Sequence, residues 1–136
     1  MDAAESHPSV SNYAMGVSAM AALDDGKLIV LEREFVVTSS KIGSFVENKI
    51  YCVDPVKSMT ISQEKALDTD SPYMQKTLIA TWKTSLGLLR QNLANYEGMC
   101  LGPRLADGSQ VIVLCADSQD QYGGVLRDWF RTIIIR

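Results

Sequence analysis

Residues 95–119 carry the sequence NYEGMCLGPRLADGSQVIVLCADSQ, in which two apolar runs flank a polar turn. The first run, residues 98–101, leads through a Gly-Pro pair to the dipeptide Asp107-Gly108, and the second run is residues 111–115. Asp-Gly between apolar runs is typical of a β-hairpin, because it supplies the positive φ angles of a tight turn while β-branched residues suit a buried, pleated surface. The stretch therefore predicts two paired strands.

The same arrangement occurs earlier, in the sequence GVSAMAALDDGKLIVLERE of residues 16–34. An offset of 82 residues places Gly16 on Gly98 and the Asp25-Gly26 dipeptide on Asp107-Gly108. After one inserted residue at 109–110, the apolar runs agree as well. The chain is therefore expected to contain one hairpin unit twice, with chance similarity between two ordinary Asp-Gly hairpins as the alternative.

Half of that offset, 41 residues, falls in the range of about 40–50 residues for one four-stranded propeller blade. The predicted fold is accordingly mainly β, a partial β-propeller of about two to three blades of antiparallel strands with at most one short helix. A small α+β domain with an antiparallel sheet is the alternative. Since a full propeller has at least about four blades, we expect the chain to be an interior piece of a longer one.

Composition is that of a globular domain. The chain has 136 residues, of which 46% are hydrophobic and 21% charged. Its formal net charge of −3 gives no electrostatic footprint for nucleic acid or for an anionic membrane surface. No apolar run reaches the roughly 20 residues of a membrane span, and the N-terminus lacks the basic-then-apolar order of an export signal.

The cysteines and the histidine do not suggest a metal or redox site. Cys52, Cys100 and Cys115 fall singly in apolar runs, without the close paired spacings of zinc or redox motifs. Buried small hydrophobes are the default expectation for all three, although a bridge between Cys100 and Cys115 is conceivable. His7, the single histidine, is expected to be an exposed bystander.

The expected domain organisation is a loose tail over residues 1–12 and a propeller fragment over 13–136. Residues 38–46 and 56–71 have the composition of loops. Leucines at helical spacing leave two alternatives for residues 73–94, a continuous helix or a strand followed by a short helix through Leu93; Gly87 favours the second. Trp82 is expected in the core in both cases. Strands are expected at 13–23, 27–37, 48–53, 76–82 and 125–136.

A charged triplet interrupts the second of these strands. Alternation along a strand puts Glu32 and Glu34 on one face and Arg33 on the other. The triplet is either the end of a strand that emerges into solvent or a pair of carboxylates at the mouth of a channel.

Three segments resemble a bacterial protein family. They are LIVLER at 28–33, NYEGM at 95–99 and LGPRLADG at 101–108, and their order and spacing also fit. The family is the one described as esterase-like activity of phytase. The resemblance runs from about Met15 to the C-terminus. This part of the chain is similar to the C-terminal part of the family's domain. It implies a β-propeller that is periplasmic or extracellular and that hydrolyses phosphate or other esters.

The resemblance also implies a set of site residues. The polar residues that match position by position are Glu32, Arg33, Asn95 and Glu97, and Asp117 falls where the family tends to have an Asp-Asn ending. This chain has Asp-Ser-Gln there instead, which removes one oxygen ligand. Glu32, Glu97 and Asp117 are expected to bind calcium, which takes about six to eight oxygen ligands. Glu32, Arg33 and Glu97 are the expected catalytic residues, and Arg33 and Asn95 the expected substrate-binding residues.

The first functional hypothesis is metal-assisted hydrolysis of a small phosphoester or other ester, in which calcium polarises the phosphate while Arg33 binds its oxygens. A serine–histidine triad is not expected, because no Gly-x-Ser-x-Gly motif is present and His7 is the single histidine. The alternative is a non-catalytic propeller module that binds a ligand or partner, with Glu32, Arg33 and Glu97 in an internal ion-pair network. A third possibility is a structural fragment whose missing blades hold the chemistry. Open strand edges predict self-association or pairing with missing blades.

Overall fold

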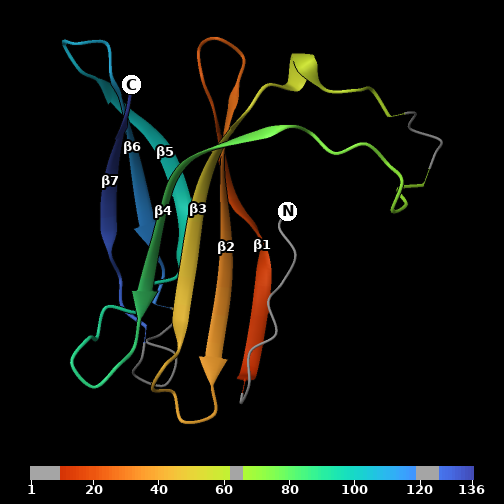
Figure 1. Ribbon diagram of the computed structural model, residues 1–136. Coiled ribbons are helices and arrows are strands. Elements are labelled where there is room, and N and C mark those ends of the chain that lie inside the picture. The colour runs from red at the N-terminus through yellow and green to blue at the C-terminus, as the bar shows by residue number, and fades with distance from the viewer. Residues whose placement is uncertain (1–9, 62–65, 119–125) are drawn as a thin grey trace.

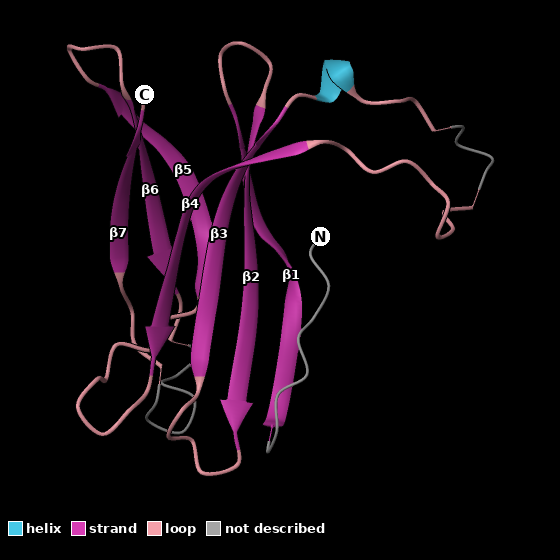
Figure 2. Cartoon of the chain, viewed as in Figure 1, coloured by secondary structure: helices cyan, strands magenta, loops and turns pink. Residues whose placement is uncertain are grey.

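Two antiparallel β-sheets make up the structure, a computed structural model that describes residues 10–61, 66–118 and 126–136. The first sheet has four strands and the second has three, each in the order of the chain (Figure 1). Within the described residues the single helical element is the short 3₁₀ helix η1 (Pro55–Lys57), drawn in cyan in Figure 2. The strands are β1 (Val10–Ala22), β2 (Leu28–Thr38), β3 (Phe45–Val53), β4 (Lys76–Ser85), β5 (Tyr96–Arg104), β6 (Gln110–Ala116) and β7 (Phe130–Ile135).

This architecture confirms the mainly β fold class and agrees with a partial β-propeller. Two consecutive antiparallel meanders are what neighbouring blades look like, and one short 3₁₀ helix is within the predicted limit. No helix in the described ranges has the length and apolar character needed to cross a membrane.

The main core lies between the two sheets. Ile29 and Leu31 of β2 are fully buried and pack in one cluster with Ile112 and Leu114 of β6. Because side chains alternate along a strand, the odd-numbered residues of β2 face the second sheet and the even-numbered ones face away from it. The first strands of the two sheets, β1 and β5, also contact each other.

The two predicted hairpins are present and have the same turn. In the first, the Leu23 amide donates to the Lys27 carbonyl at 2.8 Å, and Gly26 has a φ of +83°. In the second, the Leu105 amide donates to the Ser109 carbonyl at 2.8 Å, and Gly108 has a φ of +85°. Both glycines occupy the left-handed region, which explains why the turn needs glycine at this position. The repeat at an offset of 82 residues is therefore structural.

The half-spacing of 41 residues, in contrast, does not mark a unit. The residues between the two hairpins form β3 and β4, which complete the first sheet. The first sheet and the connections that follow it take up about twice the 41 residues expected of one blade, because two connections are long. The described parts of the first connection, residues 54–61 and 66–75, extend away from both sheets at the right of Figure 1, and the second is residues 86–95.

The predicted short helix before Leu93 is wrong. Residues 86–95 contain no helix and instead form an irregular loop with an isolated bridge between Leu86 and Gln91. A helix would bury its leucines on one stripe, but Leu93 is fully buried whereas Leu89 is 99% exposed. The preceding strand prediction is correct, and β4 extends it to Ser85.

The strand boundaries also differ from the predictions, most at the starts of β1, β3 and β7. β1 begins at Val10, so residues 10–12 belong to the sheet and not to the expected tail, while residues 1–9 with His7 lie outside the described residues. β3 begins at Phe45 rather than at 48. β7 begins at Phe130, later than the predicted start at 125, a position that lies outside the described residues.

The cysteines are free thiols. Cys52 is half-buried, but Cys100 and Cys115 are exposed, so the expectation of burial is wrong for these two. They also do not face each other, because Cys100 pairs with Val113 and Cys115 with Gly98. A bridge between Cys100 and Cys115 is therefore not formed.

Candidate functional site

Three of the predicted site residues meet at the interface of the two sheets. Arg33 of β2 donates from Nη1 to Asn95 Oδ1 and from Nη2 to Glu97 Oε1, the latter at 2.9 Å. Asn95 donates from Nδ2 to the same Glu97 oxygen at 2.7 Å. Each of the three side chains contacts the other two, and the group is called the Arg33 cluster below.

The strands position these side chains by two different devices. Arg33 faces the second sheet because it is an odd-numbered residue of β2, and its neighbours across the strands are Gly16 and Asn48. Glu97 lies in a β-bulge, since Tyr96 pairs with Ala116 and Gly98 with Cys115, which leaves Glu97 as the extra residue. A bulge redirects the side chain that it carries and is common beside active sites.

The cluster is partly open to solvent. The side chains of Arg33 and Glu97 are 21% and 31% exposed, whereas Asn95 is almost completely buried. A guanidinium has five N–H donors, and within the described residues two hydrogen bonds from Arg33 are present. The remaining donors suit the oxygens of an anion, which arginine binds well because of its planar fork.

Glu32 does not belong to this cluster. Its side chain lies on the opposite face of β2, where both carboxylate oxygens accept from Lys76 Nζ, at 3.0 and 2.9 Å. The same ammonium lies 4.1 Å from the centre of the Tyr51 ring. The predicted alternation of Glu32 and Arg33 is thus correct, but it separates the two residues that the sequence interpretation had joined in one site.

The three expected calcium ligands are not brought together. Asp117 is exposed just after the end of β6, Glu97 is held by Arg33 and Asn95, and Glu32 faces away from both. Among residues 10–61, 66–118 and 126–136, no three His, Cys, Asp or Glu side chains are grouped so as to hold a metal ion. In the described part of the chain the expected ligands therefore do not form one site, and calcium binding stays a prediction.

Two polar residues beside the cluster were not predicted. Asn48 and Trp82 follow Arg33 in the cross-strand row that begins at Gly16. Asn48 is fully buried, and in the described part of the chain its Oδ1 and the Nε1 of Trp82 have no hydrogen-bond partner. Trp82 also makes an edge-to-face contact with Tyr96, with ring centres 5.6 Å apart. Asn48 stands between Glu47 and Lys49 in the sequence, so composition alone does not mark it as an inward residue.

The comparison with protein families decides where the chain belongs. The family model Phytase-like, described as esterase-like activity of phytase, matches residues 2–119. The chain belongs to the phytase-like family. The match begins before Met15 and ends before the C-terminus, so it covers β1 to β6 of this phytase-like chain and both hairpin units. No curated protein and no solved structure matches the chain significantly.

Proposed function

We propose that this phytase-like chain takes part in the hydrolysis of a small phosphoester or other ester, with the Arg33 cluster as the site that binds the charged oxygen. Family membership supports ester hydrolysis as the reaction class. The observation that carries the proposal is the partly exposed guanidinium of Arg33, which Asn95 and Glu97 hold between the two sheets and which has N–H donors that the described residues leave unused. A fixed guanidinium stabilises the negative charge that develops on a phosphoryl or carbonyl oxygen during attack by water.

The three side chains have separate roles in this proposal. Arg33 donates to the substrate oxyanion, and Asn95 orients both other side chains through its amide. Water attacks phosphorus or the carbonyl carbon, and Glu97 accepts the proton that the water loses. The ester bond then breaks, and the same proton passes from Glu97 to the leaving alkoxide. This water-based route needs no serine nucleophile and no histidine.

The proposal is tested with p-nitrophenyl phosphate and p-nitrophenyl acetate as substrates. Arg33→Gln and Glu97→Gln should each lower kcat/KM by about 100-fold or more, the usual contribution of a positioned acid–base or oxyanion group. Glu47→Gln is the matched control, because Glu47 is a half-buried carboxylate on the other face of the first sheet. Absence of hydrolysis by the parent protein, or equal losses in all three variants, would contradict the proposal.

The first functional hypothesis also included assistance by calcium, which is tested separately. The same assays with added calcium and with a chelator distinguish a metal-dependent from a metal-independent hydrolysis. Since the expected ligands are apart in the described residues, we propose the metal-independent reaction. A loss of activity with chelator that calcium restores would overturn this choice. The periplasmic or extracellular location implied by the resemblance remains a proposal as well.

A second candidate function is a non-catalytic module that binds a ligand or partner. The observation in its favour is that the Arg33 cluster joins the two sheets and that Asn95 is 2% exposed, as in a purely structural ion-pair network. In this case Glu97→Gln lowers the melting temperature, and no ester substrate is turned over by either protein. Turnover by the parent protein that is lost in a folded Glu97→Gln variant would rule out the structural role alone.

A further inference from the structure

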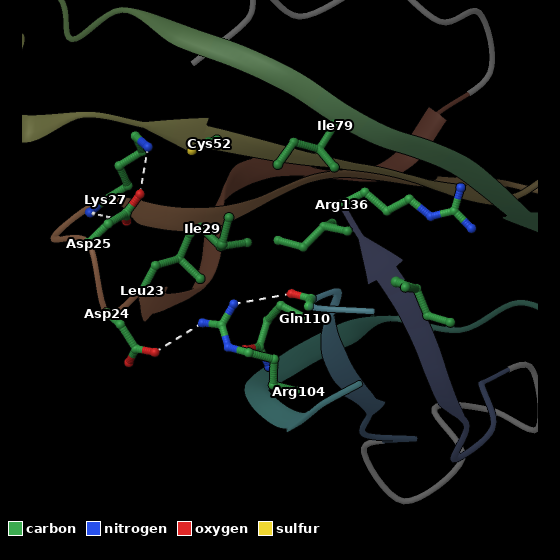
Figure 3. Close-up of a pocket in the computed structure, with 13 residues that line it drawn as sticks. Leu23, Asp24, Asp25, Lys27, Ile29, Cys52, Ile79, Arg104, Gln110 and Arg136 are labelled. Atoms are coloured by element: carbon green, nitrogen blue, oxygen red, sulfur yellow. Dashed lines mark hydrogen bonds and ion pairs between the residues drawn. The ribbon is translucent and has the colours of Figure 1, made fainter. Parts of the chain in front are cut away.

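A cavity of about 850 Å³ lies between the two sheets, at the end of the molecule that carries the two Asp-Gly turns (Figure 3). Its volume is in the range of about 300–1,000 Å³ that small-molecule sites occupy. Both sheets line it, but none of the residues of the Arg33 cluster does. The cavity is therefore a separate place in the fold, to which no role has been assigned so far.

One wall of the cavity is apolar. It is made by isoleucines from three strands, namely Ile29 of β2, Ile79 of β4, and Ile134 and Ile135 of β7. Ile79 reaches this wall because it is the extra residue of a bulge in β4, between Leu78, which pairs with Tyr51, and Ala80, which pairs with Ile50. Ile79 is 37% exposed and Ile135 is half-buried, so part of this wall is open to a ligand.

The rim on the turn side is charged. Asp24 accepts from Arg104 Nη2 at 3.0 Å, and this ion pair connects the first turn to the end of β5. Asp25 accepts from Lys27 Nζ at 2.5 Å. Each carboxylate of the rim is thus matched by a cation, as the dashed lines in Figure 3 show.

Lys27 and Arg104 have more N–H donors than their hydrogen bonds to the rim carboxylates use. An ammonium has three N–H donors and a guanidinium five. Within the described residues, one side-chain hydrogen bond from Lys27 and two from Arg104 are formed, the second of the latter to the Gly108 carbonyl. Among the described residues, the rim therefore offers unused donors and no unpaired carboxylate, which favours a ligand head group that accepts hydrogen bonds and carries negative charge.

We propose that this cavity binds a small aliphatic carboxylate, whose chain lies against Ile79 and Ile135 and whose head group meets Lys27 and Arg104. The apolar wall provides burial for the chain, and the two cations give the site its preference for an anion over a cation. The proposal does not depend on ester hydrolysis at the Arg33 cluster, since the two sites share no residue.

The half-buried thiol of Cys52 lines the cavity and gives a direct probe. Octanoate is the test ligand, and alkylation of each cysteine by N-ethylmaleimide is followed by mass spectrometry. Octanoate at about ten times its dissociation constant should slow the alkylation of Cys52 about tenfold. Cys100 and Cys115, which are exposed and do not line the cavity, should react at unchanged rates. Octylammonium and acetate, which lack the right head group or the chain, should give no protection.

Two variants complete the test. Ile79→Asp introduces a carboxylate into the apolar wall and should abolish the protection by octanoate. Leu78→Asp is the matched control, because Leu78 is the adjacent exposed residue and does not line the cavity; it should leave the protection intact. Thermal melts confirm that both variants are folded. Equal protection by octylammonium, no protection by octanoate, or equal effects of the two variants would overturn the proposal, whereas hydrolysis assays on the parent protein are independent of all three outcomes.

Discussion

Arg33 of β2 and Glu97 of β5 form an ion pair between the two sheets, with Nη2 and Oε1 at 2.9 Å. The pair is partly shielded from solvent, and Asn95 holds both partners. It links strands that lie 64 positions apart in the chain. An interaction of this kind stabilises the contact between the sheets whether or not the cluster also binds a substrate.

The stability of this link can be measured with a double-mutant cycle. Arg33→Gln and Glu97→Gln should each lower the free energy of unfolding by about 1–3 kcal/mol, because each leaves a partly buried charged partner. The coupling energy from urea denaturation should exceed about 0.5 kcal/mol. The matched cycle is Arg104→Gln with Asp24→Asn, an ion pair that also joins the sheets but is exposed, and its coupling should be close to zero. Equal coupling in both cycles would contradict a special role for the partly shielded pair of Arg33 and Glu97.

Gly102 should be far less tolerant of alanine than Gly16. A Cβ on Gly102 would lie 3.1 Å from Val111 Cγ1 and 3.3 Å from Val113 Cγ2, and β-branched side chains have little freedom to move. Gly102→Ala should therefore destabilise the protein by about 1–3 kcal/mol. Gly16→Ala meets no atom within 4 Å and should be neutral or stabilise by about 0.4–1 kcal/mol. Chemical denaturation measures the free energy of unfolding of both variants. If Gly102→Ala lowers it no more than Gly16→Ala does, the packing around Gly102 is looser than described.

Thr84 fixes the loop of residues 86–95 to β4. Its Oγ1 donates to the Ala94 carbonyl at 3.0 Å and accepts from the Ala94 amide at 3.2 Å, and Thr84 is buried. Thr84→Val keeps the shape but leaves two buried backbone groups without a partner, so the free energy of unfolding should fall by about 1–3 kcal/mol. Faster hydrogen exchange at the Ala94 amide should accompany the loss. Thr81→Val, at an exposed position of the same strand, is the control and should change stability by less than about 0.5 kcal/mol.

Lys76 should be more important for stability than its neighbour Lys83. Lys76→Met removes the ammonium that both oxygens of the buried Glu32 accept from, and this should destabilise the protein by about 3 kcal/mol. Lys83→Met is the control on the same strand: Lys83 is exposed and lies 4.0 Å from the Phe45 ring centre. Melting temperatures compare the two variants. A larger effect at Lys83 would mean that the pairing of Glu32 contributes little.

The turn carboxylates predict a pH dependence of stability. A hydrogen bond from the Ser109 amide lowers the pKa of Asp107 below its ordinary value of 3.8, and one from Lys27 does the same for the pKa of Asp25. A carboxyl group with a lowered pKa in the folded state stabilises the protein above its unfolded pKa, and this contribution disappears as the pH falls through the folded pKa. Asp107→Asn cannot titrate, so its difference in melting temperature from the parent should shrink on acidification from neutral pH to about pH 2. A constant difference over this range would contradict the assignment.

Local sequence patterns predicted the hairpins because the turn chemistry is local. Asp-Gly at 25–26 and 107–108 requires no distant contact to form its turn, and the repeat of this dipeptide pointed to one hairpin unit that occurs twice. The number of residues in a sheet was not predictable in the same way, because the long connections after β3 and β4 have no repeating pattern.

Part of the candidate site was predicted as well, because strand alternation is also a local pattern. Alternation alone separated Glu32 from Arg33, but the partner of each depends on packing between distant strands. The bulge at Glu97 is a feature of pairing register, and a single sequence does not display it. The buried Asn48 was likewise hidden, because its polar side chain falls in a strand that otherwise has ordinary composition.

The outer edge of β7 bears on how the protein behaves at high concentration. Phe130 on this strand is 80% exposed, and no strand within the described residues pairs along that edge. An open edge with aromatic and aliphatic side chains is a template for aggregation. A lysine in place of Phe130 would act as a gatekeeper there, because a charge on an edge strand opposes stacking of further chains without disturbing the buried core.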